Sequence, residues 1–186
     1  MGSRIRRTHP HRLTVSRPAA GAALSRWDVV DTGTLYDIPG RDVENMNSDY
    51  YSNDLTEDET LVFLETLSKV WAVTNNYWYP LKPINRDDVI AFKADEFENK
   101  FGFFELRKIL INNLEIYEIR EWLDKGKIVR FETFEPRYDG DGEGFWFQQD
   151  MKWMIYCSHE NTISIGGQEL VQSIKDNWKD WNQYIW

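Results

Sequence analysis

Residues 144–167 read GFWFQQDMKWMIYCSHENTISIGG, and this stretch decides the fold class. Three short runs within it are rich in aromatic and β-branched side chains: Phe145–Gln149, Lys152–Ser158 and Thr162–Ile165. Such runs are typical of β-strands. They are separated only by Asp150-Met151 and by His159–Asn161. Connections this short join antiparallel neighbours, so the stretch predicts consecutive antiparallel strands.

Two further runs of the same kind precede this stretch. Leu114–Trp122 and Lys127–Phe134 flank the turn Asp124–Gly126, and the turn-rich segment Asp139–Gly144 leads into Phe145. The whole region therefore predicts an antiparallel sheet of about four to five strands in a meander. One more short strand is expected at Leu35–Ile38, inside a polar, turn-rich segment.

A helix is expected to begin after Thr56. Thr56 and Glu59 have the spacing of a capping box, in which each side chain satisfies a free backbone N–H. The apolar residues that follow have helical spacing: Val62, Phe63, Leu67, Val70 and Trp71. This helix should end near Asn75-Asn76, because Pro80 and Pro83 follow closely.

Two more helices are expected, one on each side of the sheet region in the sequence. The first should begin after Asn85, with Asp88 near its positive end, and stop at Gly102. Periodicity leaves Phe103–Ile111 open between helix and strand. The last helix, Gln168–Trp178, should follow Gly166-Gly167, with Trp181, Tyr184 and Trp186 packing back onto the body. Two helices, then a meander, then one helix indicate an α+β fold.

Charge divides the chain into two parts. Residues 1–26 hold six Arg and no acidic residue, and they show no hydrophobic periodicity. They are interpreted as a basic tail, either disordered or added artificially, with a mitochondrial transit peptide as the alternative. Residues 27–186 are expected to form a single domain and carry a net charge of −15. A field of that sign repels nucleic acid and favours a basic protein partner.

Other features bear on location and cofactors. The longest apolar runs are far shorter than a membrane-spanning helix, so no membrane contact is expected. Cys157 is the only cysteine, which fits a cytoplasmic protein without disulfides. One cysteine and one histidine outside the tail cannot form a His/Cys zinc site without carboxylates, and no cofactor is expected.

One loop has the spacing of calcium ligands. Asp139, Asp141 and Glu143 alternate with glycines, and Asp150 stands at the twelfth position. Strands rather than helices are expected on both sides of this loop. A hairpin connection is therefore the preferred interpretation, and a calcium site is the alternative.

The only histidine outside the tail lies beside the cysteine. Cys157, His159 and Glu160 are candidates for a catalytic group, because imidazole next to a thiol can produce a reactive thiolate. No nucleophile-elbow motif accompanies them. A buried structural cysteine and a turn histidine are the preferred interpretation, and a small enzyme is the alternative.

The predicted partner-binding surface combines aromatic and acidic residues. Tyr77, Trp78 and Tyr79 form an aromatic run in a loop, where they either bind a partner or pack over the core. The acidic residues assigned to the same surface are Glu132, Glu135, Asp139, Asp141 and Glu143.

The stretch 153–160, WMIYCSHE, followed by Ile163–Gly167, resembles small acidic bacterial proteins of uncharacterised or toxin-immunity type. That resemblance covers the last third of the chain and implies a cytoplasmic protein that sequesters a toxin. It transfers no functional residues. Together with the charge it favours an acidic binding module, whose finer form is an immunity protein or antitoxin that captures a basic partner.

Overall fold

The computed structural model describes residues 50–110 and 115–186, all of which belong to one unit, Pro39–Trp186. The predicted basic tail and the expected strand Leu35–Ile38 lie outside the described residues. The α+β class is confirmed, because four α-helices accompany an antiparallel sheet in the described ranges.

Seven strands form the sheet, more than the four to five predicted. Their order in space is β1-β4-β3-β5-β6-β7-β2, and every pair is antiparallel. The strands are β1 Tyr51–Asp54, β2 Val89–Lys93, β3 Ile116–Arg120, β4 Lys127–Val129, β5 Gly144–Phe147, β6 Met154–Ser158 and β7 Thr162–Gly166. Only β5, β6 and β7 follow one another as a simple meander, since β5 pairs with β3 rather than with β4.

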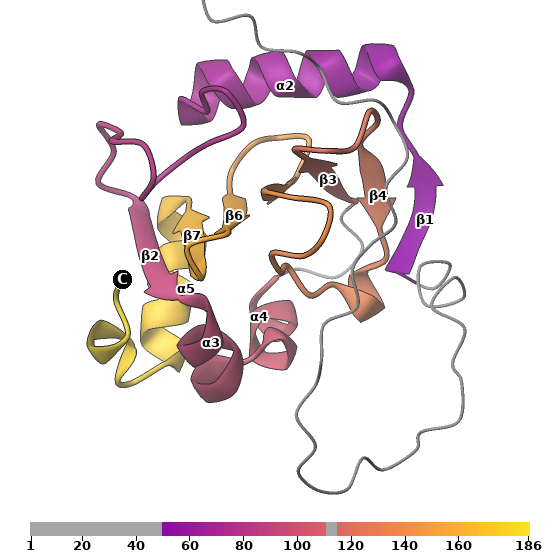
Figure 1. Ribbon diagram of the computed structural model, residues 1–186. Helices are drawn as coiled ribbons and strands as arrows, with labels where there is room; N and C mark the ends of the chain where they lie inside the picture. Colours follow the sequence, from indigo (N-terminus) through magenta and orange to yellow (C-terminus); the bar gives the residue numbers. More distant parts are fainter. Residues whose placement is uncertain (1–49, 111–114) are drawn as a thin grey trace, which may run out of the picture. The chain divides into compact units, whose positions relative to one another are not determined.

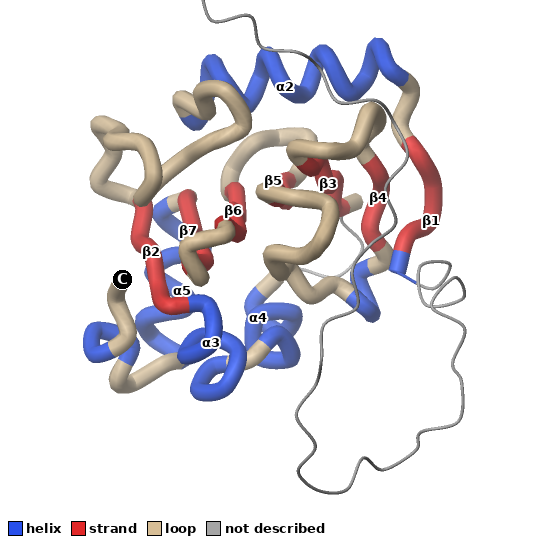
Figure 2. The backbone as a smooth tube through the Cα atoms, in the orientation of Figure 1, coloured by secondary structure: helices blue, strands red, loops and turns tan. Residues whose placement is uncertain are grey.

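Helices cover both faces of the sheet (Figures 1 and 2). Helix α2, Glu57–Trp71, lies on one face, and its Leu67 and Trp71 pack with Phe145 and Phe147 of β5. The opposite face carries α4, Phe103–Ile109, and α5, Gln168–Asn177, which pack around Trp146. A strand with both faces buried reads as one continuous apolar run, which explains the sequence of β5.

The capping box at the start of α2 is confirmed. The Thr56 side chain accepts a hydrogen bond from the Glu59 N–H, and the Glu59 carboxylate accepts one from the Thr56 N–H. The helix ends at Trp71, a little before the predicted Asn75. The C-terminal helix was also predicted correctly, within one residue.

The helix predicted after Asn85 is wrong at its start. Val89–Lys93 is instead strand β2, which pairs with β7 along its whole length. Its run of apolar residues suits a strand buried on both faces, which periodicity does not distinguish from a helix. A short helix α3, Ala94–Glu96, and a π-helical segment η1, Phe97–Phe101, follow it and end at Gly102, as expected.

The chain end covers the outer edge of β2. The Trp186 N–H donates to the Ala91 carbonyl, and the Lys93 N–H donates to the Tyr184 carbonyl. Trp181, the first residue of the short helix η3, Trp181–Gln183, and Tyr184, which follows that helix, pack against the core as expected. The Trp186 side chain, which was expected to pack with them, is instead 53% exposed. An edge covered in this way offers fewer free backbone groups for pairing with another chain.

Candidate functional site: an acidic cluster around His159

Three connections at one end of the sheet bring acidic residues together. The Glu121 N–H after β3 donates to the Glu143 carbonyl, and the Trp122 N–H donates to the Asp141 carbonyl. The turn between β6 and β7 adds His159, whose side chain contacts Glu143. We call this group the acidic cluster; its members are Tyr77, Glu121, Tyr138, Asp139, Asp141, Glu143, His159 and Glu160.

Glu143 and His159 form the centre of the cluster. The Nδ1 atom of His159 is hydrogen-bonded to Oε1 of Glu143, and the His159 backbone N–H points at the same oxygen from 3.3 Å. The second oxygen, Glu143 Oε2, is buried and has no hydrogen-bond partner among the described residues. The outer side of the imidazole faces Glu160, with 3.4 Å between Nε2 and Oε1.

The surrounding carboxylates favour a protonated imidazole. The hydrogen bond that the His159 ring donates to Glu143 raises the pKa of His159 above its ordinary value, with further contributions from Glu160 and Glu121. The Tyr77 hydroxyl lies beside Glu121, and that carboxylate raises the pKa of Tyr77. The cluster therefore has a negative field, which favours positively charged groups.

A buried ionic network supports the cluster from beneath. Arg120 pairs with Glu118 inside the sheet and with Asp139 at the cluster, where Nη1 and Oδ1 are 2.6 Å apart. Glu118 also accepts hydrogen bonds from Tyr51 and from the Trp146 ring. This network fixes the Asp139 loop relative to the strands. The alternation within β3 places Glu118 and Arg120 on one face, a signal in the sequence that could have identified the pair.

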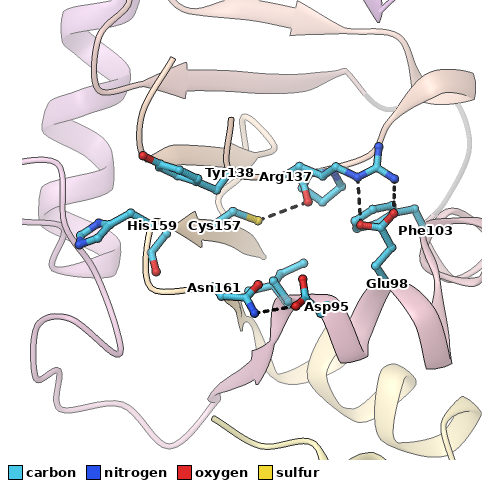
Figure 3. A pocket seen from close by; sticks show the side chains of 12 residues that line it. Asp95, Glu98, Phe103, Arg137, Tyr138, Cys157, His159 and Asn161 are labelled. Carbon is cyan, nitrogen blue, oxygen red and sulfur yellow. Dashed lines mark hydrogen bonds and ion pairs between the residues drawn. The ribbon is translucent and has the colours of Figure 1, made fainter. Parts of the chain in front are cut away.

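The catalytic alternative with a Cys157 thiolate does not agree with the geometry. The Cys157 thiol is buried and donates to the Pro136 carbonyl, with 3.3 Å between Sγ and O. Burial raises the pKa of Cys157, which disfavours the reactive thiolate. Cys157 and His159 both line a small hollow of about 200 Å³, but Figure 3 shows the sulfur and the imidazole ring directed away from each other.

The structure does not bring the residues of the calcium alternative together around one point. Asp139 is bound to Arg120, and Glu143 to His159, while Asp150 lies in the β5–β6 turn and pairs with Lys152. Among residues 50–110 and 115–186, no three His, Cys, Asp or Glu side chains are placed so that they could hold a metal ion. The hairpin interpretation agrees with the bridge between Asp139 and Gly142.

The aromatic run was assigned to the binding surface incorrectly at Trp78. Its ring is completely buried between α2 and the sheet, and its Nε1 donates to the Trp71 carbonyl at 2.6 Å. Tyr77 and Tyr79 are half-buried, and only Tyr77 belongs to the acidic cluster. The predominant role of this run is packing over the core.

The predicted acidic residues are divided between two places. Asp139 and Asp141 lie in the acidic cluster with accessible side chains, whereas Glu143 is in the cluster but buried, so it cannot contact a partner directly. Glu135 lies elsewhere, paired with Arg107 and Arg137, and Glu132 is exposed in the neighbouring 3₁₀ turn η2, Phe131–Thr133. The sequence analysis missed Glu121 and Tyr138, because only the fold brings them next to His159.

Comparisons with known proteins found no relative of the chain. No family model, no curated protein and no solved structure matched the chain. In the described ranges, every helix is too short or too polar to cross a membrane.

Proposed function

We propose that the protein is an acidic binding module that captures a basic protein partner through the acidic cluster. The observation that supports this is that the carboxylates of the cluster outnumber the cations that pair with them. In the part of the chain that the structure describes, no Lys or Arg forms an ion pair with Glu121, Asp141 or Glu160. The same part, taken as a whole, contains 25 acidic and 15 basic residues. Such a field speeds the encounter with a basic partner and repels nucleic acid.

The finer form of the proposal is an immunity protein or antitoxin. In that form the partner is a basic toxin in the cytoplasm, and binding blocks the toxin's activity. The resemblance of residues 153–167 to small acidic bacterial proteins supports this form, as does a chain with a single, buried cysteine. Inhibition requires that the bound partner be covered at its own functional surface, which a rigid acidic surface can do.

A capture experiment with charge-matched variants tests the proposal. The cluster variant Glu121→Gln/Asp141→Asn/Glu160→Gln keeps the Glu143–His159 pair, and the control Glu65→Gln/Glu169→Gln/Asp176→Asn removes the same charge elsewhere. Proteins from the native source that the full chain retains are identified, purified and measured in direct binding at low and moderate salt. We expect a basic protein whose affinity falls roughly 10-fold or more in the cluster variant, since each lost ionic contact weakens binding. Equal affinity for the cluster and control variants would contradict the proposal, as would capture of no protein at either salt.

A second candidate function is general acid–base catalysis by His159. The buried Glu143 holds the Nδ1 side of the imidazole, and a carboxylate in that position orients a catalytic histidine in many hydrolases. The His159 side chain is about half exposed, and it lines the hollow in Figure 3 together with Tyr138 and Asn161. Cys157 is not a nucleophile beside it, because its thiol points away from the imidazole.

Turnover measurements distinguish this candidate from binding. A panel of p-nitrophenyl esters and phosphate esters is incubated with the full chain, with His159→Gln and with Glu143→Gln. The catalytic candidate requires turnover that both variants lose, whereas the control Glu160→Gln keeps the imidazole and most of the rate. Turnover that is unchanged in His159→Gln would exclude His159 as the catalytic base.

A further inference from the structure

An open groove of about 450 Å³ lies beside the first half of α2. One wall is formed by α2, and the other by the connection between β3 and β4. The apolar residues that line it are Leu61, Leu64, Ile119 and Leu123. The acidic residues that line it are Glu57, Glu121 and Asp124. The groove thus combines an apolar floor with a negative rim.

One large apolar side chain that lines the groove is in contact with water, as is a tryptophan that does not line it but stands between two lining residues in the sequence. Leu61 lines the groove and is 60% exposed, and Trp122, next to Glu121, is 63% exposed. Exposed leucine alone is common on protein surfaces, but an exposed apolar groove with a polar rim is typical of a binding surface.

Stabilisation of α2 explains only one of the three acidic residues of the rim. Acidic residues in the first turn of a helix stabilise the positive end of its dipole, which accounts for Glu57. Glu121 and Asp124 come from the opposite wall and have no such role. Lys125 contacts Glu57 only at 3.7 Å, in a pair that is exposed on both sides, so it balances little of this charge.

The groove is continuous with the acidic cluster. Glu121 lines the groove and also lies beside Tyr77, and its backbone N–H is bonded to Glu143. Trp122 is bonded through its N–H to the Asp141 carbonyl. A partner bound at the acidic cluster could therefore contact the groove at the same time.

We infer that the groove binds an amphipathic basic segment of the partner, with an apolar side chain on Leu61 and Leu123 and Lys or Arg side chains against the rim. This inference rests on the proposed function and names the chemistry of the partner. Charge complementarity favours this occupant. A second copy of the chain fits less well, because a symmetric contact would place the rim of Glu57, Glu121 and Asp124 against the same carboxylates.

The test uses the full chain and designed peptides. The probe is a capped peptide of about 14 residues, long enough to form a helix, in which Leu and Lys repeat with helical spacing. A second peptide has Ser in place of every Leu and keeps the charge, and a third has Glu in place of every Lys. Binding is measured by calorimetry, and the binding surface is mapped by backbone amide shifts. We expect the Leu/Lys peptide to bind roughly 10-fold more tightly than the Ser/Lys peptide, the Glu peptide not to bind, and the shifts to fall on residues 57–64 and 119–124.

Matched variants make the outcome specific. Leu61→Ser and Leu123→Ser should each weaken binding of the Leu/Lys peptide several-fold and leave binding of the Ser/Lys peptide unchanged. Val70→Ser, which removes an exposed apolar side chain from the far end of the same helix, should change the binding of neither peptide.

Equal affinities for the two basic peptides, or shifts confined to the acidic cluster, would overturn the inference and leave the proposed function standing. No binding of either basic peptide would count against both. Self-association that Leu61→Ser abolishes, measured by sedimentation, would assign the groove to a second copy and overturn the inference.

Discussion

His159 and Glu143 are 16 positions apart in the sequence, yet the imidazole of one is hydrogen-bonded to the carboxylate of the other. The two side chains differ sharply in environment, since that of His159 is 47% exposed and that of Glu143 is 1% exposed. A buried carboxylate needs a donor, and the ring and backbone N–H of His159 supply it. The pair therefore ties the β6–β7 turn to the loop before β5, at the centre of the acidic cluster.

The pKa of His159 should depend on Glu143. In the wild-type chain it should lie above the ordinary value of about 6.5, and Glu143→Gln should lower it, because the amide carries no negative charge. Proton NMR titration measures this value, and the His159 signal is assigned by its loss in His159→Gln. Glu160→Gln should lower the pKa less than Glu143→Gln does. A larger effect of Glu160→Gln would show that the exposed Glu160 carboxylate, rather than Glu143, has the main influence on the pKa of His159.

Stability should follow the same titration. A raised pKa in the folded state means that the pair's contribution is fully present below the ordinary histidine pKa and is lost as pH rises through the raised value. Urea unfolding of the wild type across this range should show that decline, and Glu143→Gln should remove it. The effect should be small, because His159 is half exposed to solvent. The same slope in both proteins would contradict the assignment to this pair.

Removing the charge of Arg120 should be costly. Glu118 and Arg120 are almost completely buried, so Arg120→Met leaves a buried carboxylate without its cation. We expect a loss of about 3–5 kcal/mol in the free energy of unfolding, measured with urea. Lys69→Met breaks an exposed pair with Glu65 and serves as the control, with an expected change below about 1 kcal/mol. Similar losses in the two variants would show that the network contributes no more than a surface pair.

Gly166 is required by two tryptophan rings. A Cβ atom at this position would lie 2.6 Å from the Trp71 ring and 2.8 Å from the Trp78 ring, both of which are buried in the core. Gly166→Ala should therefore destabilise the fold by about 1–3 kcal/mol, as expected for overpacking. Gly140→Ala is the control, because a Cβ there meets no atom within 4 Å. Thermal unfolding compares the two, and an unchanged melting temperature in Gly166→Ala would contradict this account.

The Cys157 thiol should be almost unreactive in the folded chain. Burial both raises its pKa and blocks access, so labelling with iodoacetamide at neutral pH should be roughly 100-fold slower than in the unfolded chain. Ser68→Cys adds a thiol at an exposed position of α2 and should be labelled rapidly under the same conditions. Labelling of Cys157 as rapid as that of the added thiol would revive the thiolate alternative.

The sequence by itself determined the elements whose signals are local. The capping box at Thr56 and Glu59, the helix Gln168–Asn177 and the strands β5 to β7 were all predicted, because each depends on residues a few positions apart. Only the tertiary structure decided which elements became neighbours. It placed β5 beside β3, turned Val89–Lys93 into an edge strand, buried Trp78 and joined His159 to Glu143. The physical reason is that burial on both faces of the sheet depends on contacts between residues far apart in the chain, and local periodicity does not record them.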